Sequence, residues 1–202
     1  MILRIAVIAI TALSSAVCPG VRGEPVQLTQ TGVFLRSTIE TYPEAEGRPI
    51  LRFLDQGRVV ADAAARDMVA GRTAEVIGRL QETAKATGQT VDTAGIVEQF
   101  HAAYGTVTSV EYRSQAIVGF GSNPDVHDLT SVLAATFYAV RTTKYPTEGL
   151  YLQIAALRLN GEARLSSVSF SRYVGNVPPW LKPAETRGGG DGEKPRSLDG
   201  EQ

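Results

Sequence analysis

The stretch from Leu150 to Tyr173, LYLQIAALRLNGEARLSSVSFSRY, decides the fold. At its centre lies Asn160-Gly161, a pair typical of a two-residue hairpin turn because both residues tolerate positive φ angles. The ten residues before this turn and the run from about Arg164 onward are therefore predicted to be two antiparallel strands joined by a tight hairpin.

Two further strands are expected before this hairpin. From Val107 onward, apolar residues such as Val110 and Tyr112 alternate with polar ones, which predicts a strand with one buried and one wet face. The segment 131–144 is apolar on both faces until Arg141, as in a central strand. Together with the hairpin, these segments predict an antiparallel meander of about four strands.

Three amphipathic helical patterns precede the strands. The first has apolar residues at spacings of three and four and stops before Gly71; they are Phe53, Gly57, Val60, Ala64 and Met68. The second, capped by Thr73 and ended by Gly88, has its apolar face at Val76, Ile77, Leu80 and Ala84. The third, capped by Asp92 or Thr93 and ended by Gly105, carries Ile96, Val97, Phe100, Ala103 and Tyr104. Helices followed by strands predict an α+β domain with three N-terminal helices packed on the meander.

The N-terminus has the layout of a secretory signal peptide. Arg4 precedes the apolar run 5–13, and small or turn-forming residues continue to Gly23, after which cleavage is expected. The run is shorter than the roughly 20 apolar residues that a membrane span needs. We therefore expect export to the periplasm or the medium. Acylation of Cys18 would make a lipoprotein instead, but the three preceding residues fit that pattern poorly.

Composition limits the function of the mature chain. Loss of residues 1–23 removes Cys18, Arg4 and Arg22, which leaves no cysteine and 18 basic against 21 acidic residues, a net charge of −3. Thiol chemistry and disulfides are then excluded, and nothing attracts nucleic acid or anionic lipid. No cofactor motif is present, since the glycine-rich segment 188–192 lacks the strand and helix that flank a phosphate loop.

The mature chain divides into three parts. Residues 24–49, rich in proline and glycine, are expected to be an extended lead-in, residues 50–181 a single α+β domain, and residues 182–202 a flexible, disordered tail. Near the end of the domain, Pro178-Pro-Trp180 is expected to pack back on the sheet, with an exposed partner motif as the alternative.

The order of elements resembles the nuclear-transport-factor-2-like or cystatin-like cone fold. The resemblance rests on the segment 93–112, in which a helix ends at a glycine and a strand begins at once, on the strand that holds Phe137-Tyr138, and on the final hairpin. The resemblance covers roughly residues 50–175, and the segment 93–112 is similar to the helix-to-strand junction of small exported bacterial members of that fold. It implies a curved sheet wrapped around the helices, and hardly any function, since such folds carry many activities or none.

Aromatic and basic residues on the strands are the candidate binding residues. The strand aromatics are Tyr112, Phe137, Tyr138, Tyr151 and Phe170. If the cone is not fully packed, they line a mostly apolar pocket with hydroxyl groups, and Tyr112, Phe137, Tyr138 and Tyr151 are the candidate ligand-binding residues. The alternative, a core filled by these rings, is the commoner outcome. The strand arginines gather into an anion-binding patch or lie over an exposed face; they are Arg113, Arg141, Arg158 and Arg172.

Two functions follow from these residues. The first is an exported, non-enzymatic domain that binds a small apolar ligand or a protein partner in the cell envelope. The alternative is a small hydrolase or isomerase that uses His101, beside the stripe of the third helix, as general acid and base. His127, in the segment 125–128, is flanked by aspartates, but the spacing matches no established metal site and none is expected. A boundary histidine is the simpler role for His101.

Overall fold

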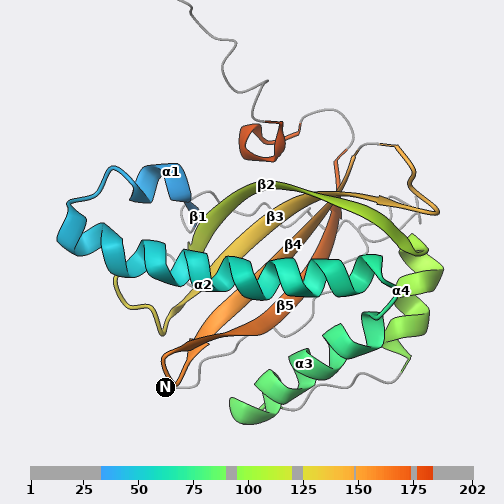
Figure 1. Ribbon diagram of the computed structural model, residues 1–202, viewed down its shortest axis with the longest axis horizontal. Coiled ribbons are helices and arrows are strands. Elements are labelled where there is room, and N and C mark those ends of the chain that lie inside the picture. The colour runs from blue at the N-terminus through green and yellow to red at the C-terminus, as the bar shows by residue number, and fades with distance from the viewer. Residues whose placement is uncertain (1–32, 90–94, 120–124, 148, 174–176, 184–202) are drawn as a thin grey trace, which may run out of the picture.

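The computed structural model describes residues 33–89, 95–119, 125–147, 149–173 and 177–183 (Figure 1). Its elements, in chain order, are β1 (Val33–Leu35), α1 (Arg36–Ile39), α2 (Glu44–Val69), α3 (Thr73–Ala86), α4 (Ile96–Tyr104), β2 (Val107–Gly119), β3 (Val132–Thr142), β4 (Leu150–Leu159), β5 (Glu162–Arg172) and the 3₁₀ helix η2 (Pro179–Leu181). The fold is α+β, as predicted.

The strands form one antiparallel sheet in the order β1-β2-β3-β4-β5, so each strand pairs with its neighbours in the chain. β3 is central, which explains why its sequence is apolar on both faces. The β4–β5 hairpin turns at Asn160 and Gly161, whose φ angles are 52° and 86°. The fifth strand is β1, whose three residues are too few to produce a recognisable alternation.

The helices differ from the prediction in number and in how one of them begins. There are four α-helices among the described residues, because the four-residue α1 precedes the three that were expected. Thr73 does not cap α3: it is the first helical residue and is buried, while Arg72 holds the cap position without a side-chain capping bond. The expected caps Asp92 and Thr93 lie outside the described residues.

The longest helix, α2, crosses one face of the sheet (Figure 1). Close approach is possible because small residues meet there: a Cβ atom at Gly57 would lie 2.6 Å from the Cβ of Ala134 and 3.7 Å from that of Ala156. The six residues that end the expected lead-in, 44–49, form the first turns of α2, and β1 and α1 also fall within it. In the described residues, the folded domain therefore begins at residue 33.

The core between helices and sheet has two adjoining parts. One lies under the C-terminal half of α2 together with α3 and α4, and the other under its N-terminal half together with α1. At the far end of the chain, η2 contacts β2 and β3 and buries Leu181. No helix in the described ranges is long and apolar enough to cross a membrane.

Candidate functional site

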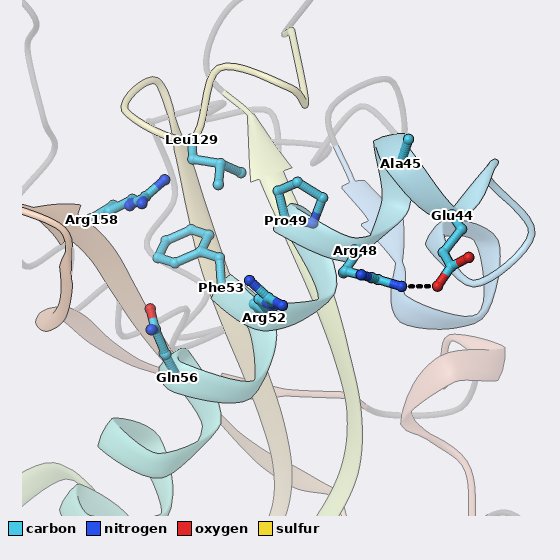
Figure 2. A pocket seen from close by; sticks show the side chains of 9 residues that line it. All are labelled: Glu44, Ala45, Arg48, Pro49, Arg52, Phe53, Gln56, Leu129 and Arg158. Carbon is cyan, nitrogen blue, oxygen red and sulfur yellow. Dashed lines mark hydrogen bonds and ion pairs between the residues drawn. The ribbon is translucent and has the colours of Figure 1, made fainter.

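An open pocket lies beside the N-terminal half of α2 (Figure 2). Its volume is about 560 Å³, and its walls come from α2, the loop before β3 and the end of β4. The lining residues are Glu44, Ala45, Arg48, Pro49, Arg52, Phe53, Gln56, Leu129 and Arg158. A pocket of this size suits a small molecule.

Helical periodicity explains how α2 supplies most of this wall. Residues four apart lie one above the other on a helix. Arg48, Arg52 and Gln56 therefore form one polar row along α2, and a second, apolar row of the same spacing lies next to it. That second row consists of Ala45, Pro49 and Phe53. α2 thus presents one polar and one apolar row of side chains to the pocket.

The pocket is positively charged. It holds three arginines and one carboxylate, Glu44, which forms an exposed ion pair with Arg48 one helical turn away. Arg52 and Arg158 are exposed, and no carboxylate in the described parts of the chain pairs with either of them. Two guanidinium charges therefore remain without a counter-charge in the lining.

The nearest carboxylates in the sequence are engaged elsewhere. Asp55, three residues after Arg52, accepts a hydrogen bond of 2.5 Å from Arg36 on α1. Glu162, across the hairpin turn from Arg158, accepts one of 2.8 Å from Arg164. Among the described residues, the fold thus supplies carboxylate partners for Arg36 and Arg164 but not for Arg52 and Arg158.

The interior of the domain, by contrast, is filled. Phe170 of β5 stacks on Tyr104 with ring centroids 4.8 Å apart and lies 5.0 Å from Phe100. The cavity that remains between α3, α4 and β5 has a volume of about 30 Å³, which is room for about one water molecule. Phe170, together with Phe100 and Tyr104, is therefore part of the core, the alternative considered from the sequence.

The four aromatic residues predicted to bind a ligand lie on two faces of the sheet. Tyr112 and Tyr138 face α2, with ring centroids 6.4 Å apart. Phe137, next to Tyr138 in β3, packs with the cluster on the opposite face. The neighbours of Tyr151 in β4, Leu150 and Leu152, belong to the helix-facing core, so Tyr151 also lies on the opposite face. Its ring centroid is 5.6 Å from that of Tyr173.

Tyr112 and Tyr138 both contact polar side chains of α2. The Tyr138 hydroxyl donates a 2.6 Å hydrogen bond to Asp62, and the Arg58 guanidinium lies 3.7 Å above the centre of the Tyr112 ring. Burial, and then the bond to Asp62, raise the pKa of Tyr138 above its usual value. A neutral tyrosine that holds a helix to a sheet is a structural arrangement.

Only one of the four strand arginines lines the pocket. That residue is Arg158; Arg113 pairs with Glu111, and Arg172 lies 5.2 Å from the ring centre of Tyr145. The sequence analysis missed Arg48 and Arg52. Their spacing of four, continued by Gln56, could have indicated a polar row on α2, but nothing in the sequence shows which row faces a hollow.

The two histidines both lie beside aromatic rings. His101 packs edge-on against Phe100 with ring centroids 5.5 Å apart, and no described carboxylate or hydroxyl bonds to its imidazole. The ring centroids of His127 and Tyr42 are 6.2 Å apart, and the backbone N–H of His127 donates a hydrogen bond to the Asp125 carboxylate. Among the residues that the structure describes, no three His, Cys, Asp or Glu side chains are grouped as metal ligands.

Comparisons with known proteins do not assign the chain to a family. The sequence has no significant match to a protein-family model, a curated protein or a solved structure. The resemblance to the cone fold therefore stays a prediction, and the argument for a function rests on the site itself.

Proposed function

We propose that the protein is an exported, non-enzymatic binding domain and that it takes a small organic anion in the pocket beside α2. The observation that carries the proposal is the pair Arg52 and Arg158, two guanidinium groups that line one pocket and have no carboxylate partner in the described parts of the chain. Export is supported by the signal-like residues 1–23.

The chemistry of the lining favours an anion over an apolar ligand. Arginine is always charged and donates in a planar fork that matches a carboxylate or a phosphate. A wholly apolar ligand would remove water from Arg52 and Arg158 without replacing the lost hydrogen bonds, which costs free energy. Pro49 and Phe53 supply contact area for the carbon skeleton of such an anion.

Thermal unfolding of the purified protein with added organic anions tests the proposal. Acetate, benzoate, succinate, citrate and glycerol phosphate, each at millimolar concentration, are compared with sodium chloride at equal ionic strength. A ligand that binds only the folded state raises the midpoint of unfolding. We expect at least one organic anion to raise it above the chloride control, and Arg52→Gln or Arg158→Gln to remove that increase.

Arg164→Gln is the matched control. Arg164 is also an exposed arginine near the end of the hairpin, but it pairs with Glu162 and does not line the pocket. It should keep the full response to anions. The proposal fails if no anion acts beyond chloride, or if Arg164→Gln loses the response as fully as Arg52→Gln.

A further inference from the structure

We infer that the pocket selects a dicarboxylate, an organic dianion with an acidic group at each end of a short apolar chain. This inference rests on the proposed function and names its ligand class. It follows from where the positive charges lie in the pocket as well as from their number.

The cationic groups stand at two separate places. Arg158 projects from the end of β4, on the sheet side of the pocket, whereas Arg52 and Arg48 project from consecutive turns of α2. Figure 2 shows Arg158 on one side of the Phe53 ring and the two helix arginines on the other. A ligand with an acidic group at each end can therefore contact both groups, one on each side of that ring.

The floor between the two cationic groups is apolar. It is formed by Phe53 and Leu129, both buried, and by the exposed ring of Pro49. Methylene groups can cover such carbon surface favourably, whereas a third charge or a hydroxyl there would lose water without finding a partner. The lining therefore matches acid, apolar chain and acid in that order.

The charges also balance for a dianion. Three arginines and Glu44 give the lining a net charge of +2, and the Glu44–Arg48 pair accounts for the one charge that is already neutralised. The two that remain, on Arg52 and Arg158, equal the charge of a dicarboxylate at neutral pH. Gln56, next in the row after Arg52, adds an amide donor for one of the carboxylates.

Titration calorimetry with matched acids tests this inference on the purified protein. Glutarate and adipate are compared with butyrate and hexanoate, which have one carboxylate on a chain of similar length, and with inorganic phosphate. We expect a dicarboxylate to bind about tenfold or more tightly than the monocarboxylate of similar length, because each carboxylate gains a charge-assisted contact. Arg52→Gln and Arg158→Gln should each remove that advantage, and Arg164→Gln should keep it.

The outcomes separate this inference from the proposed function. Equal affinity for mono- and dicarboxylates, or tightest binding of inorganic phosphate, overturns the dicarboxylate inference while leaving an anion-binding protein. Binding of none of the five probes overturns the inference, and the proposed function then stands or falls with the wider set of anions in the unfolding experiment. Because both arginines are exposed, their variants are expected to fold.

Discussion

The two ends of α2 lie on the same sheet but are covered differently. At the C-terminal end, α3 and α4 lie beside α2 (Figure 1). The cavity left between these helices and β5 has a volume of about 30 Å³. At the N-terminal end, the four-residue α1 and the loop before β3 leave a pocket of about 560 Å³ (Figure 2). One long helix on a sheet therefore does not fill its own interface: additional helices decide where the core ends and where a site can open.

The largest effect expected from this difference concerns leucine truncation. Leu80→Ala at the filled end should reduce the free energy of unfolding by about 2–5 kcal/mol, because Leu80 is 2% exposed and its truncation enlarges the small apolar cavity that it lines. Leu129→Ala at the open end should cost about 1.5 kcal/mol, since water can enter the space and only the transfer free energy is lost. Urea unfolding of both variants measures the two values.

Equal costs at the two positions would contradict the comparison. They would mean that the pocket beside Leu129 is closed in solution and behaves as core. The denaturant dependence of both variants should match that of the parent protein, so that the difference in midpoint reports stability alone.

A second, smaller loss of stability is expected at Gly57, in the middle of α2, between its filled and open ends. Gly57→Ala places a Cβ atom 2.6 Å from that of Ala134, an atom that cannot move without the sheet backbone. We expect a loss of about 1–3 kcal/mol from overpacking, despite the better helix propensity of alanine. Thermal or urea unfolding measures the change.

Gly78→Ala in α3 is the matched control. A Cβ atom at Gly78 meets no heavy atom within 4 Å, so the same substitution should stabilise the protein by about 1 kcal/mol. Ala134→Gly, combined with Gly57→Ala, should restore part of the lost stability by making room. If both glycine substitutions change stability in the same direction, close contact between α2 and the sheet is not what requires Gly57.

The sequence was sufficient for the parts of the fold that local rules control. The turn at Asn160-Gly161, the two-faced apolar pattern of β3 and the 3.6-residue spacing in α2 each reflect a conformational or burial preference that neighbouring residues already express. β1 was not predicted because its three residues form a strand only through pairing with β2. Thr73 was misjudged because a threonine that suits a cap can also be buried inside the first turn.

The pocket depends on relations that a single sequence does not contain. Arg158 was noted on its strand, but its neighbours Arg48 and Arg52 come from a helix more than a hundred residues earlier. Arg52 and Arg158 matter because neither has a carboxylate partner among the described residues: Asp55 bonds to Arg36 and Glu162 to Arg164. The four aromatic residues predicted to line one pocket do not lie together. Side chains alternate along a strand, so Phe137 and Tyr138 lie on opposite faces of the sheet.

The smallest predicted effect contrasts the arginines at the two ends of α2. At the C-terminal end, Arg72 and Arg79 both pair with Asp67, and the hydrogen bond from Arg72 is the main reason that the pKa of Asp67 lies below its usual value. A carboxyl with a lowered folded-state pKa stabilises the protein above its unfolded value of about 4, and this contribution disappears as the pH falls through the folded-state pKa. Asp67→Asn should therefore cost about 1 kcal/mol at pH 7 and progressively less below about pH 4.

Arg52→Gln at the open end is the counterpart of this experiment. Because Arg52 has no carboxylate partner among the described residues, its loss should change stability by less than about 0.5 kcal/mol, with no added dependence on pH. Urea unfolding at pH 7 and pH 3 measures both variants. A pH-dependent loss for Arg52→Gln comparable to that of Asp67→Asn would show that Arg52 is a structural arginine. If Arg52→Gln leaves the free energy of unfolding unchanged but removes the response to anions, Arg52 is a ligand-binding charge. Asp67 and its two arginines are then the charges that stabilise the fold.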